Sequence, residues 1–314
     1  MTFTTTPKRT RKSVVLAGIQ AQPNTAANLD GKAAMNVKNI SAKPLSTETV
    51  ALDFIRPWLG NTPTLITSFH VELDFEVALA GSGTPGKAPP WDPLIRACAF
   101  AATVTEDTSV VYTPISDEPE RITLVYFLDG VLQTIVNAVG SVSFGLSTGG
   151  VPTLKFHFVG DYVPLVDADV PANVDYSAFI TPQAIGDDYT PEWHIDGVTG
   201  NLSAFSLDVG NQIVYRNLVG GKGAIITDRK AAGSATFDLT SVATKNWWDV
   251  VLKGSLVPLS FTHGTVAGNI IRLASPSVQL SEPQYGDDNG NAQLQATLTL
   301  VPQAGNDELV ITLT

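Results

Sequence analysis

Residues 69–77 alternate strictly between apolar and polar side chains. The apolar positions are Val71, Leu73, Phe75 and Val77, and the positions between them are Glu72, Asp74 and Glu76. A period of two with one apolar face is typical of a half-buried β-strand. The strand brings three carboxylates and no lysine or arginine to its polar side. That side is either ordinary solvated surface or a surface with a role of its own.

The rest of the chain has the composition of a mostly β protein. Charged residues make up only 16% of it, and 26 glycines and 20 prolines supply frequent turns. Long stretches with helical periodicity are nearly absent, which favours an all-β class. Strands are predicted at residues 35–45, 49–55, 69–80, 109–113, 121–128, 131–136, 141–146 and 153–159, with a tight turn at Asp129-Gly130.

Two short helices are the expected exceptions. In residues 91–100, Pro93 suits a first helical turn and Asp92 precedes it as a predicted N-cap. Residues 246–254, with the sequence NWWDVVLKG, are the second helical candidate. Cys98 falls on the apolar side of the first helix, where a buried and inert thiol is expected.

The second half of the chain resembles the first. The motif Asn-Ile-Ser-Ala at 39–42 matches Asn-Leu-Ser-Ala at 201–204, and Phe75 matches Phe237 at the same separation. The helical candidates and the strands around them follow in the same order. We therefore predict a mostly β protein made of two duplicated β-sandwich or barrel-type domains, each with a short flanking helix. The predicted limits are an N-terminal arm at 1–13, a first domain at 14–162, a connector at 163–191 and a second domain at 192–314.

The net charge of −11 argues against a protein that holds nucleic acid through its phosphates. The basic cluster Lys8, Arg9, Arg11 and Lys12 is either a solvated terminus or a docking arm. No apolar run approaches the ~18 residues of a membrane span, so no membrane association is expected. A single cysteine excludes an intrachain disulfide framework. The expected place of synthesis is the cytoplasm.

Residue patterns for catalysis or metal binding are nearly absent. The four histidines, His70, His157, His194 and His263, show no metal-binding spacing, and the glycine-rich loop at 81–86 lacks the ending of a phosphate loop. We therefore predict neither an enzyme nor a metal site nor a cofactor.

Residues 41–100, above all 69–100, resemble the major tail tube protein of bacteriophages with long, non-contractile tails. Residues 205–239 resemble the second half of the same family. The resemblance implies a β-sandwich-like tube domain with one flanking helix, stacked as rings around a DNA channel. Its members form hexameric rings from one tube domain per chain. If the duplication is real, three copies of this chain would make a pseudo-hexameric ring.

Joining strands of neighbouring domains into one closed barrel would remove every exposed sheet edge. Six domains with about four strands each, ~4.8 Å apart and tilted by ~40°, give a backbone diameter of roughly 48 Å, which leaves room for a duplex. An acidic lining would keep phosphates from sticking to the wall. The residues predicted to face this bore are Glu72, Asp74, Glu76, Ser234, Thr236 and Asp238.

Two long loops, predicted at residues 53–68 and 215–229, follow the second strand of each copy. In the resembled family such a loop reaches the adjacent ring, and apolar side chains in a surface loop favour an interface. The alternative is a loop folded onto its own domain. The predicted inter-ring contacts are Asp53, Arg56, Trp58, Leu59, Arg216, Leu218 and Val219.

The resemblance also implies the partners and the location. The expected partners are further copies of the chain and other tail proteins, namely tape measure, terminator and distal tail proteins. Double-stranded DNA would pass without specific binding, and the protein would reside in the virion tail after assembly in the host cytoplasm. Two alternatives stay open: a capsid decoration or tail-terminator protein, and a surface β-sandwich adhesin.

Overall fold

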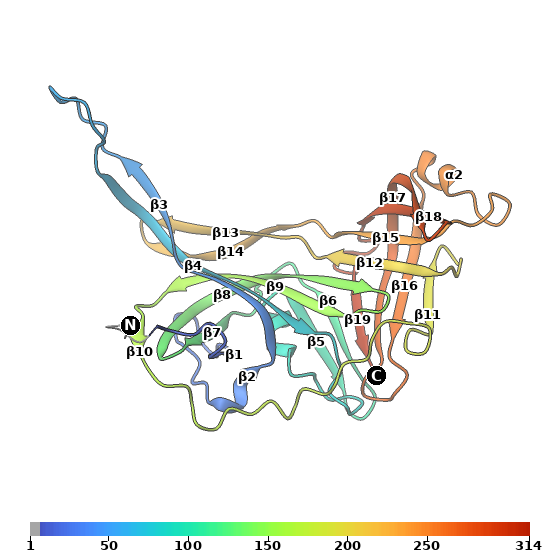
Figure 1. Ribbon diagram of the computed structural model, residues 1–314, viewed down its shortest axis with the longest axis horizontal. Helices are drawn as coiled ribbons and strands as arrows, with labels where there is room; N and C mark the ends of the chain where they lie inside the picture. Colours follow the sequence, from blue (N-terminus) through green and yellow to red (C-terminus); the bar gives the residue numbers. More distant parts are fainter. Residues whose placement is uncertain (1–6) are drawn as a thin grey trace, which may run out of the picture.

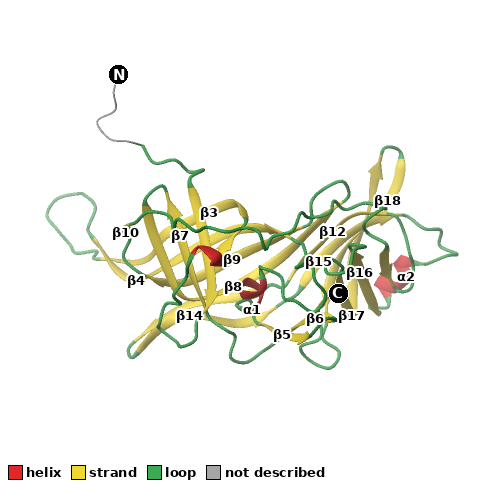
Figure 2. Cartoon of the chain, turned by 90° about the horizontal axis from the view of Figure 1, so that it is seen from below, coloured by secondary structure: helices red, strands yellow, loops and turns green. Residues whose placement is uncertain are grey.

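The computed structural model describes residues 7–314, and its regular structure is almost entirely β (Figures 1 and 2). This confirms the predicted fold class. Residues 1–6 of the predicted N-terminal arm lie outside the described residues. The strands of the first half are β1 (Ser13–Ile19), β2 (Ala34–Met35), β3 (Val37–Ala51), β4 (Thr64–Ala78), β5 (Phe100–Thr105), β6 (Ser109–Pro114), β7 (Ile122–Leu128), β8 (Val131–Ser147), β9 (Thr153–Tyr162) and β10 (Val166–Asp167). Those of the second half are β11 (Glu192–Ile195), β12 (Leu202–Asp208), β13 (Asn211–Leu218), β14 (Gly221–Arg229), β15 (Ala232–Asp238), β16 (Leu256–His263), β17 (Ile271–Asp288), β18 (Asn291–Leu300) and β19 (Val310–Leu313).

The two halves pair their strands in the same order. In the first half the order is β1–β7–β8–β9–β4–β3. In the second half it is β11–β16–β17–β18–β15–β12. The β5–β6 hairpin follows the helix of the first half and has no counterpart after the helix of the second half in residues 7–314. The pairing order is thus repeated, while the predicted domain limits stay a prediction.

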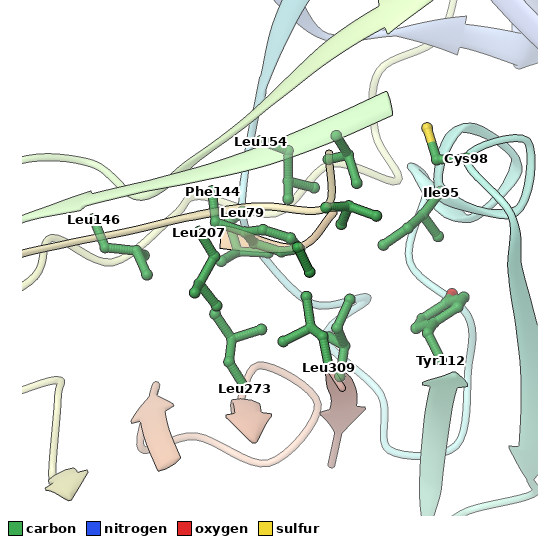
Figure 3. Packing of buried hydrophobic residues seen from close by; sticks show 14 of the residues in the cluster. Leu79, Ile95, Cys98, Tyr112, Phe144, Leu146, Leu154, Leu207, Leu273 and Leu309 are labelled. Carbon is green, nitrogen blue, oxygen red and sulfur yellow. The ribbon is translucent and has the colours of Figure 1, made fainter. Parts of the chain in front are cut away.

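The halves are joined by two direct strand pairings and by one apolar core. β8 pairs with β12, with Phe144 opposite Leu207, and the C-terminal strand β19 pairs with β6. In Figure 3, Leu207, Leu273 and Leu309 of the second half lie beside Phe144, Leu146 and Leu154 of the first. Because the core is continuous, the halves form one packed body.

The alternating strand β4 has its predicted orientation. Its side chains Val71, Leu73, Phe75 and Val77 are at most 1% exposed. The Phe75 ring packs against Phe156 and Phe158 of β9, with centroids 5.8 Å apart in both pairs. Burying each such side chain contributes about 1.5–3 kcal/mol. The burial fixes one side of β4 to the core and leaves the carboxylates on the other side.

Both predicted helices are present but short. Helix α1 spans Asp92–Arg96 and α2 spans Trp247–Leu252. In α2, the Asn246 side chain accepts a hydrogen bond from the Asp249 amide, which is an ordinary N-cap. The predicted N-cap role of Asp92 is wrong, because Trp91 occupies that position. Asp92 instead accepts hydrogen bonds from Tyr112 and Arg96.

Cys98, expected to be a buried and inert thiol, is fully buried. Burial raises its pKa, which keeps the thiol protonated and unreactive. Neither helix in the described part of the chain is long and apolar enough to cross a bilayer. The segment 163–191, predicted as a surface connector, runs along the outside of the first half in Figure 1.

His263 gives the fold a defined response to acid. Its side chain is buried beside Phe261, its Nδ1 lies 3.1 Å from the Thr190 hydroxyl, and burial lowers its pKa. The unfolded chain therefore takes up a proton at a higher pH than the folded chain does. Below the ordinary histidine pKa of about 6.5, the free energy of unfolding is expected to decrease until the folded-state pKa is reached.

This loss is measured by denaturant unfolding between pH 7 and pH 5, a range above the ordinary titration of carboxylates. We expect His263→Phe to flatten the pH dependence. The matched control is His194→Gln, which removes a partly exposed histidine and shows whether the change is specific to His263. An unchanged slope in His263→Phe would exclude His263 as its source.

Candidate functional site

One continuous polar face extends across both halves of the molecule. It is formed by the side chains of the paired strands β4, β9, β8, β12, β15 and β18 that point away from the core, together with those of β3 beside β4. The six residues predicted to face a bore all lie on it. The first group is on β4 and the second on β15, with three strands between them. The register thus places both groups on one surface, and their role as a bore lining stays a prediction.

The first-half part of the polar face is charged in pairs. Lys43 donates to Glu72 at 2.6 Å, and Asp74 lies 2.7 Å from Nδ1 of His157. Glu76 has two lysines nearby, Lys38 of β3 at 3.6 Å and Lys155 of β9 at 3.8 Å. The sequence interpretation of a face without bases is therefore wrong. The lysines and His157 come from neighbouring strands, which the pattern of β4 alone does not reveal, and His70 of β4 itself lies 3.4 Å from Glu72.

The pairing is reflected in the titration of Glu72 and Lys43. Burial acts to raise the pKa of Glu72, but hydrogen bonds from Lys43 and Ser46 outweigh it, so the pKa lies below its ordinary value. The hydrogen bond to Glu72 is the main cause that raises the pKa of Lys43. Both groups are therefore charged at neutral pH.

The second-half part of the polar face is mostly uncharged. The hydroxyls of Ser206 and Ser234 lie 2.9 Å apart across β12 and β15, and Thr236 follows on the same strand. Asp238 accepts a hydrogen bond from the Asn201 side chain at 2.8 Å.

The same hydrogen bond occurs in the first half, where Asn39 donates to Glu76 at 3.1 Å. Asn39 and Glu76 are separated by as many residues as Asn201 and Asp238. The two halves therefore repeat this hydrogen bond between an asparagine and a carboxylate. In each half, the segment between the asparagine and the carboxylate has the same length.

The two segments predicted as loops, 53–68 and 215–229, each belong to a β-hairpin. In the first half, β3 and β4 continue as a ladder to the pair Ala51 and Thr64, so that only residues 52–63 form a loop. We call residues 45–69 the arm; it projects away from the body in Figure 1. In the second half, residues 211–229 form the two-stranded sheet β13–β14, which we call the hairpin. The loop predicted at 53–68 is present at 53–63, and only residues 64–68 belong to a strand. The loop predicted at 215–229 is wrong, because β13 and β14 occupy nearly all of it although glycines and polar residues interrupt the alternation there.

The arm exposes a long series of apolar side chains. The exposed residues are Leu45, Val50, Phe54, Ile55, Trp58, Leu59, Leu65, Ile66 and Phe69. Trp58 is 66% exposed and Leu59 is fully exposed. An isolated two-stranded hairpin is marginal in water, and an apolar surface of this extent is typical of an interface. The sequence pattern identified Trp58 and Leu59 in the loop of the arm, but not the exposed apolar residues of its two strands, such as Val50 and Leu65.

The hairpin, in contrast, is packed onto the first half. It covers Val139 and Val159 on the polar face, and its own Ala224 is fully buried there. The Tyr215 hydroxyl donates to Asp161 at 2.7 Å, and Arg121 donates to the Ala224 carbonyl at 3.0 Å. Burial, followed by the hydrogen bond to Asp161, raises the pKa of Tyr215. The hairpin is thus held to the first half by apolar and polar contacts, whereas most apolar side chains of the arm are exposed.

The predicted inter-ring residues lie at the two tips. Asp53, Arg56, Trp58 and Leu59 are in the exposed loop of the arm, and Arg216, Leu218 and Val219 are exposed at the end of the hairpin. The hairpin reaches the arm, since Asn217 donates to the Thr67 carbonyl at 2.8 Å and the Lys222 ammonium lies over the Phe69 ring. Both tips therefore lie at the same end of the molecule (Figure 1).

Within residues 7–314, no three side chains of His, Cys, Asp or Glu come together in a way that could hold a metal ion. The candidate site is thus a surface: the polar face, the arm and the hairpin.

A family model described as phage tail tube protein matches residues 10–300. No curated protein matches the chain. The matched region contains the polar face, the arm and the hairpin.

Proposed function

Because the chain belongs to the phage tail tube protein family, a structural component of the virion tail, we propose that three copies of it close into a pseudo-hexameric ring. Such rings stack into a tube whose bore is lined by the polar face and lets double-stranded DNA pass without specific binding. A long, non-contractile tail is compatible with this family. The partners are further copies of the chain and the tape measure, terminator and distal tail proteins.

The observation that carries this proposal is the ladder that joins the two halves. Four strands from each half follow one another without a break, in the order β3–β4–β9–β8–β12–β15–β18–β17. The seam between the halves is β8–β12. In the described part of the chain, β3, the counterpart of β12, pairs only with β4. The outer part of β17, the counterpart of β8, pairs only with β18.

These two open edges support a head-to-tail ring. An edge with unpaired backbone groups readily accepts another strand. Pairing of β17 in one copy with β3 in the next would repeat the seam that the chain already forms internally. Three copies then supply about 24 strands, the number that gives a bore wide enough for a duplex. A head-to-tail contact closes into a ring when its rotation permits closure.

The difference between the arm and the hairpin supports the same arrangement. The hairpin of the second half lies over the first half of its own chain. The arm of the first half touches the second half of its own chain near Thr67 and Phe69, and its apolar side chains stay exposed. In the ring, the arm would lie over the second half of the next copy, which would cover its apolar sides. The two tips would remain exposed at one end and contact the adjacent ring.

Electron microscopy of the purified protein tests this proposal. Rods or stacked rings with threefold symmetry are expected. Particles that assemble only on preformed capsids or tails would favour a decoration or terminator protein. Monomers that coat cells would favour an adhesin.

Charge reversal on the polar face provides a second test. Glu72→Lys, Asp74→Lys and Glu76→Lys together should leave rods intact, because the lysine partners of the two glutamates are at least half exposed and such pairs contribute little to stability. Genome ejection should slow markedly, because the lining would then bind phosphates. The measurement is the rate of DNA release from phage particles carrying the variant. The control is Glu106→Lys, Asp117→Lys and Asp169→Lys at exposed positions outside the polar face. Equal release rates in the two variants would contradict a bore lining at these residues.

A further inference from the structure

The three lysines on the polar face of the first half each lie against a carboxylate of β4. Lys43 is bonded to Glu72, while Lys38 and Lys155 approach Glu76 from opposite sides. Every one of these lysines is at least half exposed, whereas Glu72 and Glu76 are 16% and 18% exposed. The carboxylates thus lie lower on the sheet, and the lysine stems extend over them.

Stability does not account for this arrangement. Exposed ion pairs contribute about 0–1 kcal/mol each, and long lysine side chains lose rotamer freedom when they are held in one geometry. What the pairs do change is the local charge. With Glu72, Asp74 and Glu76 ionised, the lysines are balanced, and His157 has a carboxylate partner. Without those carboxylates, three ammonium groups would stand close together on one surface.

The other half of the same face has no cation to balance. Strands β12, β15 and β18 contain neither lysine nor arginine, and their outward side chains include serine, threonine and glutamine. On the polar face as the structure describes it, cations thus occur beside the β4 carboxylates. The polar face is therefore not acidic throughout, because its lysines lie next to the carboxylates of β4.

We propose that Glu72 and Glu76, with Asp74 beside them, mask Lys38, Lys43 and Lys155 from the phosphates of DNA. The proposal rests on the bore function of the polar face and specifies how that face avoids binding DNA. A lysine that contacts a phosphate releases counterions and gains affinity. A lysine already neutralised by a carboxylate releases fewer, so the wall stays non-adhesive although it carries positive side chains.

The test measures DNA binding by the full-length chain, purified as a monomer by size-exclusion chromatography. The probe is a fluorescently labelled DNA duplex, and its anisotropy is measured at several salt concentrations. The wild-type protein should not bind at micromolar concentration. The variant with Glu72→Gln, Asp74→Asn and Glu76→Gln should bind, with a slope of log affinity against log salt of about −2.7, the value for three phosphate contacts. Adding Lys38→Gln, Lys43→Gln and Lys155→Gln to this variant should abolish the binding.

A folded triple variant that fails to bind DNA would overturn the masking proposal, as would DNA binding by the wild type or by the sixfold variant. If the triple variant does not fold, Glu76→Gln alone frees Lys38 and Lys155 and should give a slope of about −1.8. Microscopy of the wild-type protein separates the two proposals: rods with threefold rings support the tube even when the masking fails.

Discussion

A chain in which residues 49–67 are replaced by Asn-Gly is expected to remain a folded monomer and to form neither rings nor rods. Glu48 and Ser68 face each other in the β3–β4 ladder, so a two-residue turn can join them. The removed segment makes few contacts with its own body, chiefly the hydrogen bond from Asn217 to Thr67. It carries most of the exposed apolar side chains that would cover the next copy. Its loss should therefore abolish assembly and change stability little.

The matched variant shortens the hairpin instead. Replacing residues 214–225 by Asn-Gly joins the paired residues Ile213 and Ile226 and removes Tyr215 and Ala224. Because this hairpin covers Val139 and Val159 in its own chain, we expect a clear decrease in melting temperature. Light scattering, microscopy and thermal unfolding of both variants measure the contrast. Rods from the arm variant, or equal destabilisation of the two variants, would show that the arm is not an intermolecular element.

Trp58→Ala combined with Leu59→Ala is expected to leave rings intact and to prevent their stacking. Both side chains are exposed in the loop between β3 and β4 at the end of the arm, beyond the strands that would cover the neighbour within a ring. Truncating an aromatic anchor at an interface typically costs about 2 kcal/mol or more. A stacked ring would lose this at each of its three arms, which should raise the concentration needed for rods by several orders of magnitude.

Light scattering and negative-stain microscopy distinguish free rings from rods in this variant. The control is Val170→Ala with Tyr176→Ala in the connector, which also removes an exposed aliphatic and an exposed aromatic side chain. That control should form rods at the wild-type concentration. Normal rods from the Trp58 and Leu59 variant would place the contact between rings elsewhere.

Much of this fold could be predicted from local patterns. The alternation around Phe75 determined which side of β4 is buried, because a strand in contact with a core can expose only every second residue. The positions of both helices followed from short apolar runs with helical spacing. The repeated order of strands was detectable from a few matched motifs, among them the two asparagines, Asn39 and Asn201, whose hydrogen bonds recur in the structure.

The charge of the polar face and the positions of the arm and the hairpin depend on strand register and packing. Lys155 and His157 are remote from β4 in sequence, and only the pairing of β9 with β4 places them beside Glu76 and Asp74. The arm and the hairpin both looked like loops, yet one projects outward and the other lies on the first half. A single strand's periodicity specifies which face is polar, because burial acts on each residue separately. The charge of that face and the position of a hairpin depend on neighbours, which only the assembled sheet brings into contact.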